Sequence, residues 1–280
     1  MNFKQPKLPN DIHEVVALSL AEDIGSGDIT AELIDRNTKL SARIVSKDSG
    51  VFCGRPWADE AFRQVDASLE SDWHTAEGDS LSPGQTVVQI SGSARSILTA
   101  ERTVLNFLQT LSAVSTASRY HATLVKHTSV KLLDTRKTLP SLRTAQKYAV
   151  RIGGCFNHRM GLFDAFLVKE NHINACGGIA AAITRARELH PDRPVEVEVQ
   201  DLSELDQAIK ASADTVMLDN FSLEDISQAV KTNAGRVKLE ASGGIDEDRL
   251  VTIAESGVDY ISLGVLTKNC KAIDLSLLVD

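Results

Sequence analysis

Hydrophobic and polar positions alternate along short segments in the second half of the chain, and helical patterns separate the later segments. The segments expected to be strands begin near Val130, Ala165, Val195, Thr215, Val237 and Val258. Apolar residues recur with helical spacing in three later stretches, at 202–209, 223–230 and 250–254. Such alternation of strands and helices predicts a parallel sheet, and this many units favours a closed or nearly closed (β/α) barrel of TIM-barrel type.

Polar residues and glycines mark the ends of these expected helices. Ser203, Ser222 and Asp246 precede or open the apolar stripes, and their side chains suit helix N-caps. Gly235 and Gly257 stand where two of the helices should stop.

Charged residues alternate with apolar ones inside the expected strands themselves. In the segment VEVEVQ the valines should face the helices, which leaves Glu196 and Glu198 directed into the barrel. The same alternation directs Asp219 and Glu240 inward, and Lys169 ends its strand on the inward side. We therefore expect Lys169, Glu198, Asp219 and Glu240 near the C-terminal ends of neighbouring strands, where α/β barrels build active sites. The alternative is an internal network of ion pairs that only holds the barrel together.

The first part of the chain has a different pattern. We expect a helix over 12–20, a short helix over 58–65 and extended pieces around 42–46, 51–53 and 86–90. A long helical pattern follows over 96–126, for which we weigh a break near Ser112. Residues 1–114 are thus expected to form a smaller α+β domain, and residues 115–270 the barrel.

Composition narrows the class of protein. A net charge of -8 argues against a general nucleic-acid binder, and no apolar run approaches the length of a membrane span. The start of the chain has no apolar core of a secretory signal. The widely separated thiols indicate reduced cysteines in a cytoplasmic protein, with no disulfide framework or zinc site: Cys53, Cys155, Cys176 and Cys270.

Positive side chains are nevertheless concentrated between residues 134 and 172. They include Arg136, Lys137, Arg143, Arg151, His158, Arg159 and Lys169. Crowded cations repel one another and are costly to bury unpaired, so anionic ligands best explain the cluster. Arg143, Lys147 and Arg151 lie on an intervening helical segment, and we expect them to face solvent or, for Arg143, to contact phosphate. His172 is assigned no catalytic role.

An ordered set of motifs extends through the same region and beyond it. The segments DTRKT, NHR, LVKENHI, VEVEV, MLDN, LEASGGI and ISLG follow one another, after LAEDIGSGDIT and ERTVLNFLQTLS nearer the start. Together they resemble the quinolinate phosphoribosyltransferase family over nearly the whole chain, from about residue 20 to about residue 267. Any one motif is weak evidence, whereas the ordered set is specific.

The resemblance implies a fold, an activity and an assembly. The family has an α/β barrel with an N-terminal α/β sandwich, which we expect the tail 271–280 to join. It combines quinolinate with phosphoribosyl pyrophosphate, using Mg²⁺, and yields nicotinate mononucleotide, pyrophosphate and CO₂ for NAD synthesis. Its homodimers share active sites, with Arg102 of this chain at the position that enters the neighbouring barrel; a hexamer is the larger alternative.

Residue roles follow from the resemblance and from the chemistry of the substrates. Arginine forks match carboxylates and lysine supplies compact charge, so we expect quinolinate to be bound by Arg102, Arg136, His158, Arg159, Lys137 and Lys169. Glu198 and Asp219 are expected to hold the ribose hydroxyls and Mg²⁺, directly or through water. Backbone N–H groups are expected to bind phosphate at Ser242, Gly243, Gly244 and Gly264. Lys137, Lys169, Glu198 and Asp219 are the expected catalytic residues.

Two alternatives to the transferase stay open. A related group of proteins linked to molybdenum transport looks similar, and a non-catalytic binding protein on the same scaffold is also conceivable. The presence of Lys169 together with Arg102 favours the transferase.

Overall fold

The computed structural model describes residues 6–269 and 271–280, so Cys270, expected to be a reduced thiol, lies outside the described residues. The chain divides into two compact units. The first comprises the residues up to Tyr120, with Thr138–Gly154 and Val265–Asp280, and the second comprises His121–Lys137 with Cys155–Gly264. The expected division between residues 114 and 115 stays a prediction.

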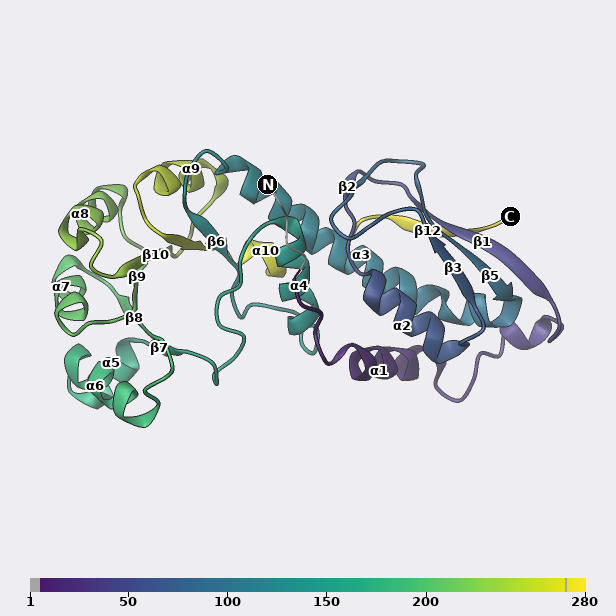
Figure 1. Cartoon of the computed structure of the whole chain (residues 1–280), viewed down its shortest axis with the longest axis horizontal. Helices are drawn as coiled ribbons and strands as arrows, with labels where there is room; N and C mark the ends of the chain where they lie inside the picture. Colours follow the sequence, from purple (N-terminus) through teal and green to yellow (C-terminus); the bar gives the residue numbers. More distant parts are fainter. Residues whose placement is uncertain (1–5, 270) are drawn as a thin grey trace. The chain divides into compact units, whose positions relative to one another are not determined.

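The second unit is built on a parallel sheet. Its six strands lie in the order β6 (Lys131–Leu133), β11 (Tyr260–Ser262), β10 (Lys238–Ser242), β9 (Thr215–Asp219), β8 (Val195–Val199) and β7 (Phe166–Val168). Phe156 adds a single parallel bridge to Leu133 at the β6 edge. The sheet curls around its own interior with helices on the outside (Figure 1), and the predicted α/β barrel is thereby confirmed.

Helices follow the strands of this barrel. They are α5 (Glu170–Cys176), α6 (Ile179–Leu189), α7 (Leu202–Lys210), α8 (Leu223–Asn233) and α9 (Glu247–Glu255). The apolar stripes that predicted α7, α8 and α9 are buried against the sheet side, as at Leu205, Ile226 and Ile253. Their burial supplies the free energy that holds short helices of ordinary propensity in place.

The predicted N-cap residue is confirmed at two helices, α8 and α9, and is wrong at the third, α7. The Ser222 hydroxyl accepts a hydrogen bond from the backbone N–H of Asp225, and Asp246 caps α9 in the same way. The prediction of Ser203 for α7 is wrong, because the Asp201 carboxylate accepts the N–H of Glu204 at 2.8 Å. The N-cap of helix α7 is therefore two residues earlier than predicted, and Ser203 lies inside the first turn.

An antiparallel sheet is the core of the first unit. Its strand order is β12 (Leu275–Val279), β1 (Lys39–Ser46), β5 (Thr86–Ser93) and β3 (Glu70–Trp73), and β2 (Gly50–Val51) pairs separately with β4 (Ser80–Leu81). Pairing of β12 with β1 brings the last residues of the chain into a sheet begun near its start. Strand β3 was not predicted, because its first three residues are exposed and polar and so show no apolar alternation.

Helices accompany this sheet in the first unit. They are α1 (Ile12–Ile24), a 3-10 turn at Ala31–Leu33, α2 (Arg55–Val65), α4 (Arg143–Gly153), α10 (Val265–Lys268) and the long α3 (Ala94–Leu124) up to Tyr120. The break weighed near Ser112 does not occur. The Ser112 hydroxyl donates to the Cys53 carbonyl and accepts its N–H, so a buried polar group is satisfied without interrupting the helix.

One of the basic residues of helix α4 does not face solvent as expected. Lys147 was expected to face solvent, but it is fully buried. Its neighbours on α4 from Ala145 to Val150 are buried as well, so the helix is enclosed on more than one side. Arg143 is half-buried and its Nε donates to the Thr138 hydroxyl at 3.1 Å.

None of the helices in the described part of the chain has both the length and the apolar character needed to cross a bilayer.

Candidate active site

Three of the predicted site residues lie at the C-terminal ends of neighbouring strands in the second unit. Lys169 directly follows β7, Glu198 is next to last in β8, and Asp219 is the last residue of β9. Lys169 Nζ forms an ion pair with Glu198 Oε2. The Nδ1 atom of His172 accepts the backbone N–H of Lys169 at 3.1 Å, so His172 orients the start of α5.

Asp219 is joined to the glycine loop after β10 through Asn220. The Asn220 amide donates to Asp219 Oδ2 at 2.9 Å, and its backbone N–H donates to the Ser242 carbonyl at 3.0 Å. Asn220 has a left-handed backbone with φ of 57°, which asparagine tolerates better than most residues. The sequence analysis assigned Asn220 no role, although it is the last letter of the quoted MLDN motif.

Lys137 and Gly264 also meet. Lys137 lies beyond the end of β6 and Gly264 beyond the end of the adjacent β11. A Cβ atom added to Gly264 would lie 3.2 Å from Cδ of Lys137, so the lysine side chain covers this glycine. Two residues that were predicted for different roles thus lie together at the same end of the sheet.

Asp134, which the sequence analysis left without a role, anchors the segment that carries His158. It is completely buried just after β6. Its carboxylate accepts the backbone N–H of His158 at 2.9 Å and the side-chain amide of Asn157 at 2.6 Å. The initial aspartate of the DTRKT motif was the available signal.

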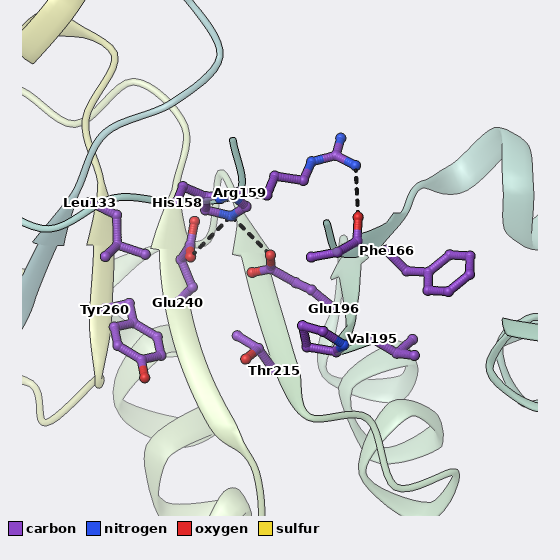
Figure 2. A pocket seen from close by; sticks show the side chains of 11 residues that line it. Leu133, His158, Arg159, Phe166, Val195, Glu196, Thr215, Glu240 and Tyr260 are labelled. Atoms are coloured by element: carbon purple, nitrogen blue, oxygen red, sulfur yellow. Dashed lines mark hydrogen bonds and ion pairs between the residues drawn. The ribbon is translucent and has the colours of Figure 1, made fainter. Parts of the chain in front are cut away.

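The His158 side chain points into the barrel interior towards two glutamates. Its Nε2 atom lies 2.9 Å from Glu196 Oε2 and 3.5 Å from Glu240 Oε2, and the group borders a cavity of about 160 Å³ (Figure 2). Glu240 was expected near the strand ends, but it lies in the middle of β10 and is only 1% exposed. Burial, and next the charge of Glu196, raise the pKa of Glu240 to about 8.

Arg136 and Arg159 provide positive charge in the second unit. Burial, and next the nearby charge of Arg136, lower the pKa of Arg159. The Arg159 guanidinium also donates to the Ala165 carbonyl at 3.3 Å. A second guanidinium close enough to disfavour the charge of Arg159 favours a site for an anion.

Arg102 differs from these residues in its location. It is an exposed residue of α3 and belongs to the first unit. It is therefore not part of the group that the second unit brings together.

Two sets of donors have the chemistry of cation ligands. Glu198 and Asp219 offer carboxylate oxygens at the ends of adjacent strands, as Mg²⁺ prefers. His158, Glu196 and Glu240 offer one donor atom each, all within 4.8 Å of one another. The first set lies at the rim of the barrel and the second in its interior.

Known proteins resemble this chain along its whole length. The family models for the N-terminal and C-terminal domains of quinolinate phosphoribosyl transferase match residues 28–112 and 114–278. A probable nicotinate-nucleotide pyrophosphorylase (carboxylating) of Bacillus subtilis is 40% identical over 91% of this chain and 89% of its own length. A chloroplastic nicotinate-nucleotide pyrophosphorylase (carboxylating) of Arabidopsis thaliana is 37% identical over 100% of this chain and 86% of its own.

Solved structures agree with the sequence relatives. The nicotinate-nucleotide pyrophosphorylase of Francisella tularensis superposes with a TM-score of 0.93 at 49% identity, over 99% of both chains. NadC of Streptococcus pyogenes gives a TM-score of 0.92 at 38% identity, again over 99% of both chains. The chain belongs to the quinolinate phosphoribosyltransferase family.

Proposed function

We propose that the chain is a quinolinate phosphoribosyltransferase that makes nicotinate mononucleotide, pyrophosphate and CO₂ from quinolinate and phosphoribosyl pyrophosphate in de novo NAD synthesis. The observation that carries this proposal is the placement of Arg136 near enough to Arg159 to act on its charge, in the same barrel as the ion pair of Lys169 and Glu198. Relatives named for this activity match nearly the whole chain.

Quinolinate is the substrate that suits the basic side chains. It carries two adjacent carboxylates, and a guanidinium can bind each through two parallel hydrogen bonds. A bound dianion relieves the repulsion that Arg136 exerts on Arg159. We propose that Arg136 and Arg159 bind the carboxylates, with Lys137, Lys169 and His158 beside them.

The sugar phosphate has a separate set of groups at the same rim. Gly243 and Gly244 follow β10 with φ of 95° and 52°, conformations that suit glycine. We propose that their backbone N–H groups bind phosphate together with Ser242 and Gly264. Lys137, which covers Gly264, supplies a compact positive charge at this position.

Glu198 and Asp219 fit Mg²⁺ by donor type, since both present hard oxygen ligands at neighbouring strand ends. When bound, Mg²⁺ would offset the negative charge that develops on the departing pyrophosphate. Glu198 and Asp219 would also accept hydrogen bonds from the ribose hydroxyls. Lys169, which pairs with Glu198, would be free to contact substrate once a cation shares that carboxylate.

The chemistry requires positioning more than a nucleophile. Displacement of pyrophosphate by the pyridine nitrogen makes the ring cationic, and that charge stabilises the carbanion left when the neighbouring carboxylate departs as CO₂. A proton from water then completes the C–H bond at that ring carbon. The role proposed for the chain is to orient both substrates and to screen charge as it develops. Arg136 and Arg159 hold the ring, while the rim groups hold the sugar.

A shared site in a homodimer is the proposed assembly. Ile29 and Leu33 are 80% and 85% exposed, and their segment is tied to α3 by a hydrogen bond from the Thr99 hydroxyl to Asp28. Arg102 lies one helical turn beyond Thr99 on the same face of α3. Exposed apolar side chains beside Arg102 support a subunit interface there. A hexamer stays a prediction.

A direct assay tests the proposed activity. Purified protein mixed with quinolinate, phosphoribosyl pyrophosphate and Mg²⁺ should release pyrophosphate and CO₂ in equal amounts, with nicotinate mononucleotide as the product. Omission of Mg²⁺ or of either substrate should abolish release. Binding of quinolinate without turnover by well-folded protein would contradict the proposal and favour a binding protein on this scaffold.

A further inference from the structure

Both ring nitrogens of His158 are engaged inside the second unit. The backbone N–H of Arg159 donates to Nδ1 at 2.8 Å, and Nε2 lies 2.9 Å from Glu196 Oε2. A backbone amide can only donate, so Nδ1 must be the nitrogen without a proton. The single proton of the neutral ring is then on Nε2, from which it is donated to Glu196.

Glu240 completes this arrangement on the strand two places away. Its Oε2 lies 3.5 Å from the same Nε2, and its side chain is almost completely buried. Two buried carboxylates around a neutral ring are costly to ionise together, and the pKa of Glu240 is accordingly raised to about 8. Burial and the charge of Glu196 thus favour the protonated form of Glu240, which can donate to the Glu196 carboxylate beside the ring.

The same three side chains are of metal-ligand type, with donor atoms within 4.8 Å of one another. Coordination through Nε2 would require the proton of the neutral ring to move to Nδ1. Nδ1 already accepts the N–H of Arg159, and a second hydrogen there would collide with it. The orientation of the ring therefore favours a hydrogen-bonded network over a metal centre.

We propose that Glu196 and Glu240 are positioning residues for quinolinate binding, which hold His158 as the neutral Nε2–H tautomer so that its Nδ1 orients the backbone of Arg159. This inference rests on the proposed function, because it assigns both glutamates to the quinolinate end of the same site. His158 then adds no positive charge to the basic cluster. The arginines and lysines bind the substrate carboxylates, and the imidazole of His158 orients Arg159 through the hydrogen bond from its backbone N–H.

The tautomer can be measured in the wild-type protein without substrate. Long-range ¹H–¹⁵N spectra of histidine-labelled full-length protein, with His158→Gln to assign the signals, should show a protonated Nε2 and a bare Nδ1 from pH 6 to pH 8. A proton on Nδ1, or titration of His158 near the ordinary histidine value of about 6.5, overturns the proposal.

Variants test whether the tautomer matters for binding. Glu196→Leu removes the acceptor, so the Nε2–H signal should be lost and KM for quinolinate should rise roughly tenfold, the effect of one lost hydrogen bond to a charged group. KM for phosphoribosyl pyrophosphate should change much less. Glu240→Gln keeps a donor towards Glu196, so its Nε2–H signal and its KM for quinolinate should stay near those of wild type. Glu240→Leu removes that donor and should change the Nε2–H signal and raise KM for quinolinate.

Glu255→Leu is the matched control. It removes the carboxylate of an exposed pair, in which Glu255 Oε1 lies 3.0 Å from His127 Nε2, on the same barrel. It should alter neither the His158 signals nor KM. A folded, active Glu196→Leu variant that keeps its tautomer and its KM for quinolinate overturns the inference alone. An inactive wild-type protein with the expected tautomer contradicts the proposed function instead.

Discussion

Gly243 occupies a position at the end of β10 that no larger residue fits. Its φ of 95° lies in the left-handed region, and an added Cβ would stand 2.2 Å from Oδ1 of Asn220. Because Gly243 has no side chain, Asn220 fits beside it. The Asn220 amide donates to the Asp219 carboxylate and so orients a proposed site residue. Gly244 also has a positive φ, but nothing lies within 4 Å of its added Cβ.

The two glycines make a matched pair for mutation. Gly243→Ala should push Asn220 away and release Asp219, so KM for phosphoribosyl pyrophosphate should rise at least tenfold, equivalent to about 1.4 kcal/mol. Gly244→Ala introduces backbone strain of about 1 kcal/mol without a collision and should change KM little. Steady-state kinetics with thermal melts as a folding check measure both. Equal effects of the two changes would exclude the collision as the cause.

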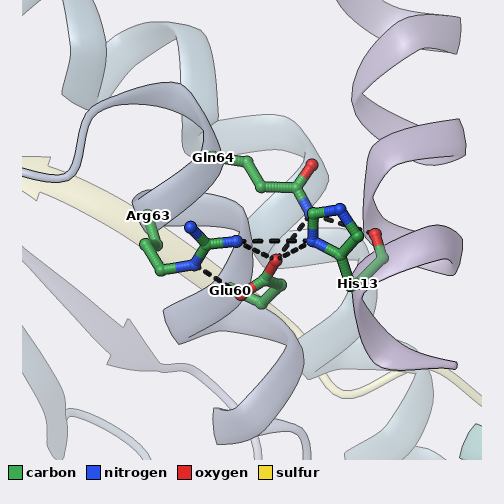
Figure 3. Close-up of polar contacts among 4 residues, drawn as sticks. All are labelled: His13, Glu60, Arg63 and Gln64. Atoms are coloured by element: carbon green, nitrogen blue, oxygen red, sulfur yellow. Dashed lines mark hydrogen bonds and ion pairs between the residues drawn. The ribbon is translucent and has the colours of Figure 1, made fainter. Parts of the chain in front are cut away.

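At the scale of elements, α1 and α2 are joined by a polar network. Glu60 of α2 accepts hydrogen bonds from Arg63 and Gln64 on its own helix and contacts His13 of α1 with 2.7 Å between Oε1 and Nδ1 (Figure 3). The hydrogen bond from Arg63 is the largest cause that lowers the pKa of Glu60 to about 2. The charged form of Glu60 is thus favoured in the folded chain.

This shift predicts a pH dependence of stability with a definite sign. A carboxyl group whose pKa falls on folding stabilises the folded chain above its unfolded pKa and loses that effect as pH falls towards the folded value. Glu60→Gln should lower the free energy of unfolding by less than about 1 kcal/mol at pH 7, because solvent screens the network. The difference from wild type should disappear between pH 4.5 and pH 2.

Urea unfolding of both proteins across this pH range measures the effect. Glu22→Gln, a change at an exposed glutamate of α1, is the control and should leave stability unchanged at every pH. A loss in Glu60→Gln that is as large at pH 2.5 as at pH 7 would show that the network does not depend on the charge of Glu60.

At the scale of the whole molecule, the proposed dimer assigns one site to two chains. Arg102 belongs to the first unit, whereas Lys169 and Lys137 belong to the second. If Arg102 serves the neighbouring barrel, then a mixed dimer of Arg102→Ala and Lys169→Ala subunits has one site with both changes and one site with neither.

Subunit mixing should therefore restore activity. Each variant alone should retain below about 1% of wild-type activity, and fully exchanged mixtures should recover about a quarter, since half of the dimers carry one intact site of two. Mixing Lys169→Ala with Lys137→Ala should restore nothing, because both residues belong to the same barrel. No recovery after proven subunit exchange would reject the role of Arg102 across the interface.

The features that could be predicted from the sequence alone are those that depend on neighbouring residues and on the chemistry of single side chains. Period-two alternation in VEVEV and helical spacing in α7, α8 and α9 depend on near neighbours, so the barrel was predictable. Lys169 and Glu198 lie at the ends of neighbouring strands, as expected, whereas the contact of Lys137 with Gly264 was not predicted.

Contacts between distant segments decided the rest. Burial of Lys147, the position of Glu240 beneath the rim and the pairing of β12 with β1 depend on residues far apart in the sequence. The tautomer of His158 depends on Glu196 and on the backbone turn at Arg159 together, which no local pattern encodes. The sequence determined which groups stand at the strand ends, and only the tertiary structure decided their depth, burial and protonation, because these depend on what the folded chain packs around each group.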